Sequence, residues 1–79
     1  MDKNYTFEMF WEDMKNGFQF YYNYKDCKFL IYKLNNNCYK KELIEGPEKV
    51  PYQKNEIVTL KRVKELFPDM EKLEYKVFE

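Results

Sequence analysis

The sequence of 79 residues contains no histidine, no serine and no alanine, and it has one arginine and two threonines. Acyl transfer by serine or cysteine needs a nucleophile held beside a base, and that base is usually histidine. A carboxylate pair or a lysine of lowered pKa would need a dry cleft, which a chain this short can hardly enclose. We therefore expect no enzymatic activity, no catalytic residue and no cofactor.

Long apolar runs are also missing. No segment approaches the roughly 18 apolar residues of a membrane-spanning helix, and 35% of the residues are charged. The N-terminus lacks the basic-then-apolar order of a signal peptide. Because short chains form one domain at most, we expect a single small domain over residues 1–79, located in the cytoplasm and not in a membrane.

Cysteine is scarce, with only Cys27 and Cys38 present. A structural zinc site needs four nitrogen or sulfur ligands, which a chain without histidine and with two cysteines cannot supply. On a hairpin that turns at residues 35–37, Cys27 would lie about seven residues, or roughly 24 Å, from the position opposite Cys38. A disulfide tolerates about 7 Å between Cα atoms. We expect two free thiols and no metal site.

Apolar periodicity predicts a helix near the N-terminus. The spacing i, i+3, i+4, i+7 of a single helical face is kept by Phe7, Phe10, Trp11 and Met14. Thr6 precedes this stripe as a capping residue, and Asn16-Gly17 can end the helix in a left-handed conformation.

Three strands of an antiparallel meander are predicted to follow. Residues 18–24 alternate with period two, residues 27–34 are apolar at odd and even positions through their middle, and residues 38–44 alternate loosely. Lys25-Asp26 and residues 35–37 supply the turns. We expect residues 27–34 to form the central strand and residues 38–44 to lie nearer an edge.

The remainder predicts a loop, a second helix and a last strand. Residues 45–51 hold one glycine and two prolines and form the loop, followed by a short extended piece within residues 52–58. Thr59 can cap a helix that Pro68 ends, and residues 73–78 alternate again. The expected fold class is α+β: an N-terminal helix, a three-stranded antiparallel meander, a second helix and a C-terminal strand, with the helices on one face of the sheet.

A short helix that stops at Asn16-Gly17, an aromatic strand, a hairpin and a closing helix together resemble small uncharacterised α+β proteins of low-GC Gram-positive bacteria and their phages. The composition agrees with such a source, since thirteen lysines against one arginine and seven asparagines are typical of A/T-rich coding. The resemblance covers most of the chain and implies a small accessory or mobile-element protein. It carries over no functional residue.

Sixteen aromatic residues are more than one small core can bury. We expect the core to take one or two tyrosines and the rings of Phe7, Phe10, Trp11, Phe18, Phe20 and Phe29. If Phe20 faces the helices, Tyr22 shares its face and Tyr21 points away. Helices on one side of the sheet thus leave a second face that bears tyrosines, which are enriched in protein interfaces.

Charge is concentrated in the same part of the chain. Residues 25–41 carry five lysines and one aspartate, whereas residues 1–16 and 42–79 each hold two more acidic than basic residues. Lysines at sheet edges often serve only to prevent strand aggregation. In a functional interpretation, the partner-binding surface consists of Tyr21, Tyr32, Tyr39, Lys25, Lys28, Lys33, Lys40 and Lys41.

Three functions are consistent with that surface. The favoured one is a non-enzymatic protein-binding module whose tyrosines anchor, and whose lysines steer, a protein with an acidic surface. Its specific form is a phage or mobile-element inhibitor of a host defence enzyme, comparable to an anti-CRISPR, or of a replication enzyme. Alternatively the aromatics stack bases of single-stranded nucleic acid, although one arginine and a sequence pI of about 6.3 count against this. The third alternative is a structural homodimer or larger homo-oligomer that buries the same face.

Overall fold

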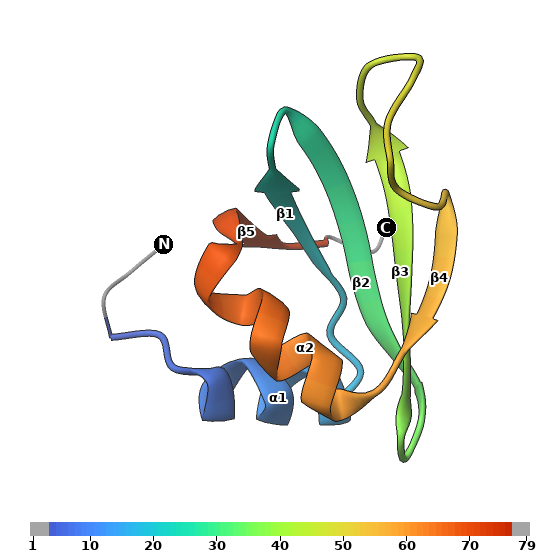
Figure 1. Cartoon of the computed structure of the whole chain (residues 1–79). Helices are drawn as coiled ribbons and strands as arrows, with labels where there is room; N and C mark the ends of the chain where they lie inside the picture. The colour runs from blue at the N-terminus through green and yellow to red at the C-terminus, as the bar shows by residue number, and fades with distance from the viewer. Residues whose placement is uncertain (1–3, 77–79) are drawn as a thin grey trace.

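Two helices cover one face of a five-stranded antiparallel sheet (Figure 1). The computed structural model describes residues 4–76. In chain order the elements are α1 (Phe7–Lys15), β1 (Phe20–Tyr24), β2 (Cys27–Asn35), β3 (Cys38–Glu45), β4 (Asn55–Val58), α2 (Leu60–Leu66), the 3-10 helix η1 (Phe67–Asp69) and β5 (Glu71–Tyr75). The strand order is β4-β3-β2-β1-β5. The α+β class is confirmed, but the described sheet has one strand more than the meander and C-terminal strand expected from the sequence.

Both helices begin where the sequence predicts. The hydroxyl of Thr6 accepts the N–H of Met9 at 3.3 Å, and the hydroxyl of Thr59 accepts the N–H of Arg62 at 3.3 Å. These bonds satisfy donors that have no partner inside a helix. Gly17 follows α1 with a φ of +96°, the left-handed stop that glycine permits. Pro68 does end the α-helical hydrogen bonding, but the chain continues through it as the single 3-10 turn of η1.

Two tight turns build the meander. Lys25 and Asp26 both have positive φ, 46° and 64°, as the commonest two-residue hairpin turn requires. The side chain of Asn35 accepts the N–H of Asn37 at 3.2 Å at the second turn. β2 lies in the middle of the sheet and is the central strand, as expected. β3 lies one strand in from the edge, because the extended piece after the loop becomes β4 and pairs with it.

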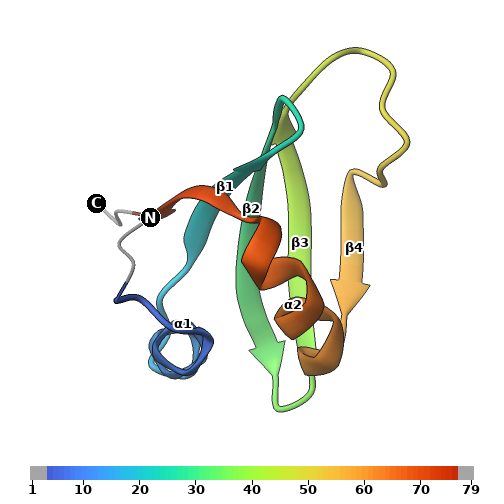
Figure 2. The same cartoon turned by 60° about the vertical axis from the view of Figure 1, so that its left-hand side comes forward.

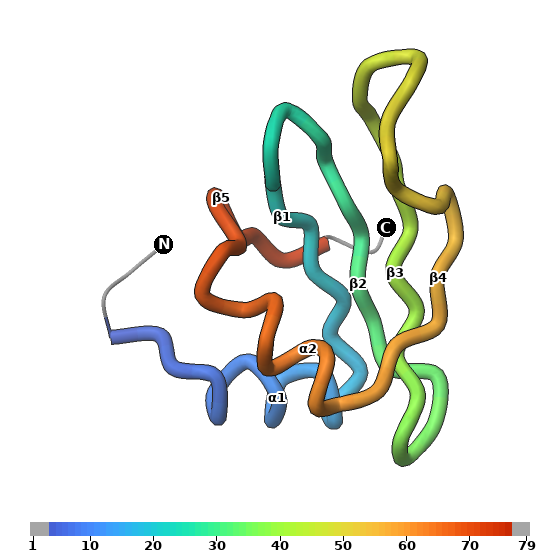
Figure 3. Tube along the Cα trace, in the orientation of Figure 1, coloured from blue at the N-terminus to red at the C-terminus, as the bar shows by residue number. Residues whose placement is uncertain are grey.

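The segment α2–η1 carries the chain from one edge of the sheet to the other. It leaves β4, crosses the face on which α1 also lies, and leads into β5, which pairs with β1 (Figures 2 and 3). The C-terminal strand is therefore present and begins at Glu71, two residues before the predicted start. Val77 and Phe78, which the prediction included, lie outside the described residues.

The core lies between the two helices and one face of the sheet. Its buried members are Phe10, Met14, Phe20, Tyr22, Cys27, Phe29, Ile31, Tyr39, Val58, Val63 and Met70. Phe7 and Trp11 pack against this cluster but are only half-buried. The expectation that Phe18 is buried is wrong, because it precedes β1 and is 46% exposed. We call the face of the sheet toward the helices the inner face and the opposite one the outer face.

Candidate protein-interaction surface

Cross-strand register decides which side chains share the outer face. Tyr21 lies opposite Leu30, which lies opposite Glu42, and Tyr32 lies opposite Lys40, which lies opposite Ile57. Directly opposed residues in antiparallel strands project from the same side of a sheet, and Phe20 and Tyr22, the neighbours of Tyr21, belong to the core. The outer face therefore includes Tyr21, Lys28, Leu30, Tyr32, Lys40, Glu42, Ile57 and Glu74.

The outer face has an apolar centre. Leu30 is only 4% exposed and yet is not a member of the core cluster. Neither described helix lies on this side, so the surrounding outer-face side chains must cover Leu30. Tyr21 and Tyr32 are half-buried around it, and Ile57, on the edge strand β4, is 56% exposed. Tyrosine and aliphatic side chains thus dominate the middle of an uncovered sheet face.

Lys28 and Lys40, on the outer face, are each paired with a glutamate. Nζ of Lys28 lies 3.7 Å from Glu74 Oε1 and 4.6 Å from the centroid of the Tyr21 ring. Nζ of Lys40 lies 3.2 Å from Glu42 Oε1, and hydrogen bonding to Glu42 raises the pKa of Lys40. Two of the five positive charges that the sequence concentrates in the hairpin are therefore paired with acidic side chains.

The other predicted lysines do not join this surface. Lys25 is exposed in the β1–β2 turn, 5.3 Å from the Tyr24 ring centroid, and a hydrogen bond to Tyr24 raises its pKa. Lys33 is half-buried opposite Tyr39, near the β2–β3 turn. Lys41 lies on the inner face, 4.5 Å from the centroid of the buried Phe29 ring. Three of the five predicted lysines are thus separated from Lys28 and Lys40.

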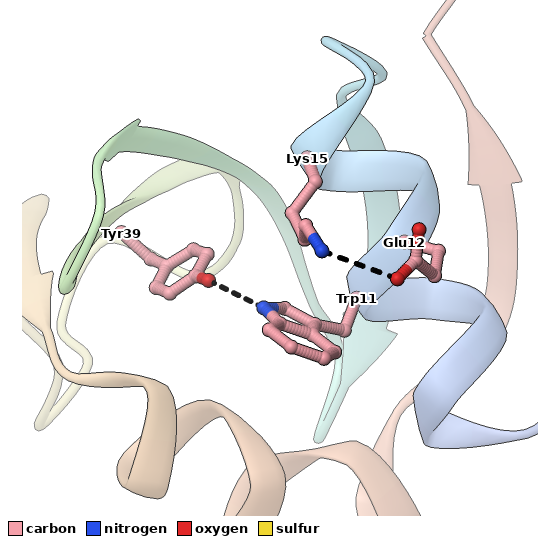
Figure 4. Close-up of polar contacts among 4 residues, drawn as sticks. All are labelled: Trp11, Glu12, Lys15 and Tyr39. Atoms are coloured by element: carbon pink, nitrogen blue, oxygen red, sulfur yellow. Dashed lines mark hydrogen bonds and ion pairs between the residues drawn. The ribbon is translucent and has the colours of Figure 1, made fainter.

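Tyr39 does not lie on the outer face, and the prediction that it anchors a partner there is wrong. It is 0% exposed and belongs to the core cluster. Its hydroxyl accepts a hydrogen bond from the indole Nε1 of Trp11 at 3.1 Å (Figure 4). Its cross-strand partner on β4, Val58, is also buried in the core. Tyr39 therefore has a structural role in joining β3 to α1.

Four residues of the outer face were not part of the predicted partner-binding set. Alternation along β2 places Leu30 on the outer face once Phe29 is known to face the helices. Alternation along β3 places Glu42 on the same face as Lys40. Ile57 belongs to a four-residue strand whose short, half-polar sequence gives little signal. Glu74 reaches Lys28 only because β5 pairs with β1, a relationship between segments that are distant in the sequence.

Comparisons with known proteins provide no relative from which a function could be inferred. No family model, curated protein or solved structure matches this chain. Within residues 4–76, no helix has the length and apolar character needed to cross a membrane. Cys27 and Cys38 are both free, as predicted.

Proposed function

We propose that this chain is a non-enzymatic protein-binding module that contacts its partner through the outer face of the sheet. The observation that carries the proposal is a sheet face that no described helix covers, on which Tyr21, Tyr32 and the exposed Ile57 lie on the same side as the buried Leu30. Interfaces are enriched in tyrosine because its ring provides contact area and its hydroxyl stays hydrated at the rim. A sheet face with this content, covered by no described helix, offers contact area to a protein surface.

The charges of the outer face define the chemistry of the partner. Lys28 and Lys40 are each paired with a glutamate, so little free positive charge is available to attract a strongly acidic protein. We propose a partner with an apolar recess for the tyrosine rings and with charges of both signs around it. Buried anchors would supply most of the affinity, and the rim charges would mainly fix orientation.

The specific form of the proposal is an inhibitor encoded by a phage or mobile element that blocks a host defence or replication enzyme. It is supported by the small size of the domain and by an amino-acid composition typical of A/T-rich coding sequences. A chain of this size acts most simply by covering a functional surface of a larger protein. The inhibitor would therefore bind its target with a fixed stoichiometry and leave it chemically unchanged.

Capture from a lysate of a low-GC Gram-positive host, followed by titration of the purified partner, tests the proposal. The diagnostic variant is Tyr21→Ala/Tyr32→Ala. The matched control is Met9→Ala/Phe18→Ala, which truncates two side chains that are 48% and 46% exposed but lie outside the outer face. We expect the control to bind like the wild type and the diagnostic variant to bind at least about tenfold more weakly, since truncated anchors commonly cost more than 1 kcal/mol. If the diagnostic variant is folded by circular dichroism and binds as tightly as the control, the proposed surface is wrong.

Inhibition is tested with the captured enzyme itself. Adding wild-type chain should lower the activity of the enzyme, with saturation at a fixed molar ratio, and the Tyr21→Ala/Tyr32→Ala variant should need a correspondingly higher concentration. Full activity in the saturated complex would show a module that binds without inhibiting. That outcome would reject the inhibitor and leave the binding surface in place.

The two alternative functions give different results with the same preparations. A nucleic-acid protein should bind a labelled single-stranded oligonucleotide at about 50 mM salt and lose most of that affinity at about 200 mM salt. The ion pairs of Lys28 and Lys40 count against this outcome. A homo-oligomer should give more than the monomer mass by light scattering, with the Ile57→Asp variant shifting the mass toward the monomer.

A further inference from the structure

A shallow pocket of about 450 Å³ lies between α1 and the end of β5, away from the outer face. Tyr75 lies opposite the core residue Phe20 and so projects to the inner side of the sheet, where α1 packs. Tyr5, just before α1, and Met9, in its first turn, complete the apolar wall. Met9 and Tyr75 are 48% and 47% exposed, so a ligand in this pocket can touch both side chains.

The two tyrosine rings of this pocket are held at both ends. On the core side, the centroid of the Phe20 ring lies 6.3 Å from that of Tyr5 and 4.8 Å from that of Tyr75. At the other end, both hydroxyls donate to Asp13 Oδ2, at 2.6 and 2.9 Å. The Phe18 ring lies 5.3 Å from that of Tyr75 and extends the apolar surface beyond the pocket. The aromatic wall is therefore preformed, and a ligand need not order it on binding.

Every charged side chain that lines this pocket is acidic. Glu8 and Glu12 are four residues apart on one face of α1, and Asp13 lies beside them. Lys15 is 3.2 Å from Glu12 and offsets one of the three charges. Glu8 and Asp13 take part in none of the ion pairs formed among residues 4–76. Two of the three negative charges therefore remain uncompensated beside the apolar wall.

This combination matches a cation that is carried on an apolar stem. A hydrated metal ion would leave the apolar wall uncovered, and an anion would be repelled by the carboxylates. An arginine side chain supplies both parts, because its methylene stem packs on apolar surface while its planar guanidinium stacks on an aromatic ring and donates to carboxylates. The ammonium of lysine is more strongly hydrated and has no plane with which to stack.

We propose that this pocket is a second docking surface, which binds an arginine side chain from a basic segment of a partner protein. The guanidinium would lie against the Tyr75 ring and face the carboxylates of Glu8, Glu12 and Asp13, and the stem would contact Met9. The proposal does not depend on the outer face, because Tyr75 and α1 lie on the other side of the sheet. Occupation of one surface leaves the other open.

Backbone amide NMR at constant ionic strength, with a capped peptide of three arginines as the probe, tests the proposal. We expect saturable shifts at Tyr5, Met9 and Tyr75. A capped peptide of three lysines carries the same charge but should bind more weakly, because its ammonium groups cannot stack on the rings.

Two variants and a matched control locate the binding site. Glu8→Gln/Glu12→Gln keeps the shape of two exposed side chains and should bind the arginine peptide at least about fivefold more weakly, the size expected when two exposed charge contacts are lost. The control Glu48→Gln/Glu71→Gln removes the same charge from exposed positions outside the pocket and should bind like the wild type. Tyr75→Leu keeps every carboxylate and removes one ring, and it should weaken binding by a similar factor.

Four results would overturn the proposal. Shifts that do not saturate, or that lie away from the pocket, would show that the arginine peptide has no site there. Equal losses in Glu8→Gln/Glu12→Gln and in the control would show a general attraction between charges. Lysine peptide that binds as tightly as arginine peptide would reject stacking. Weaker binding by the outer-face variant Tyr21→Ala/Tyr32→Ala would place the peptide on the outer face, whereas failure of that face to bind a protein leaves the present test unaffected.

Discussion

The indole Nε1 of Trp11 donates a hydrogen bond of 3.1 Å to the hydroxyl of Tyr39, and this bond joins α1 to β3 through the core (Figure 4). Tyr39 is 0% exposed, whereas Trp11 is half-buried and lies beneath Nζ of Lys15, 4.4 Å from its ring centroid. Tyr39, one of the tyrosines of the basic hairpin, therefore lies on the inner face. The division of hairpin tyrosines between the two faces is what defines the proposed binding surface.

A double-mutant cycle should detect this bond. Trp11→Phe and Tyr39→Phe should each lower the free energy of unfolding by about 1–2 kcal/mol, because each leaves its partner without a hydrogen bond. The double variant should lose less than the sum of the two, by about 1 kcal/mol. Urea unfolding followed by circular dichroism provides the four values. Strict additivity would show that the contact contributes nothing to stability.

Alanine substitutions of two hairpin tyrosines should separate the faces. Tyr39→Ala removes a fully buried ring and should lower the free energy of unfolding by about 3–5 kcal/mol. Tyr32→Ala, on the outer face, should cost about 1 kcal/mol or less, as most surface substitutions do. The comparison uses thermal and urea unfolding of both variants. Similar losses for the two would contradict the assignment of Tyr39 to the core and Tyr32 to the surface.

Tyr22→Phe should change the pH dependence of stability at alkaline pH without lowering stability at neutral pH. Burial raises the pKa of Tyr22 in the folded state above its usual value, and the charge of Glu56 adds to this. Above about pH 10 the unfolded chain releases this proton while the folded chain keeps it, so stability falls by up to about 1.4 kcal/mol per pH unit. Tyr22→Phe should lose this contribution to the slope. At about pH 7 it should be as stable as the wild type or more stable, because the deleted hydroxyl has no partner.

Urea unfolding of both proteins between about pH 7 and about pH 11 measures the difference in slope. The hydroxyls of Tyr5 and Tyr75 both donate to Asp13 Oδ2, at 2.6 and 2.9 Å. Burial chiefly raises the pKa of Tyr5, and the bond to Asp13 chiefly raises that of Tyr75. Both tyrosines add to the alkaline loss in the two proteins alike. Identical slopes for wild type and Tyr22→Phe would mean that Tyr22 is not buried as described.

The two thiols should react at different rates. Cys27 is 2% exposed at the start of β2, where Gly46 packs against it, whereas Cys38 is half-buried beside the β2–β3 turn. A thiol reagent should modify Cys38 first and Cys27 only when the domain opens. The time course should show a fast phase that Cys38→Val abolishes and a slow phase that denaturant accelerates. A fast phase that survives Cys38→Val would contradict the position of Cys27.

Local signals were sufficient to predict both helices and the central strand. Thr6 and Thr59 act as caps, Gly17 ends α1, and Lys25-Asp26 forms the first turn, each for reasons confined to a few neighbouring residues. The alternation of residues 38–44 was also predicted, and in β3 it puts Tyr39 and Lys41 on one side and Lys40 on the other. Which side faces the helices depends on cross-strand partners such as Lys33 and Tyr39, so the sequence alone could not place Tyr39 in the core.

Long-range pairing explains what sequence reasoning missed in the candidate surface. Summing charges along the chain suggests a basic hairpin, but β5 returns to the far edge of the sheet and places Glu74 beside Lys28. Pairing of β4 with β3 similarly places Ile57 next to Lys40 on the outer face. Neither neighbour is encoded locally, because each depends on which strands meet after the chain has crossed the inner face.

Hydroxyl-radical footprinting of the free chain and of its complex with the captured partner, read residue by residue by mass spectrometry, tests the outer face most directly. We predict that Tyr21, Tyr32 and Ile57 lose reactivity in the complex while Met9 and Phe18 keep theirs. Protection of Met9 and Phe18 with no change at Tyr21 and Tyr32 would contradict the outer face as the binding surface.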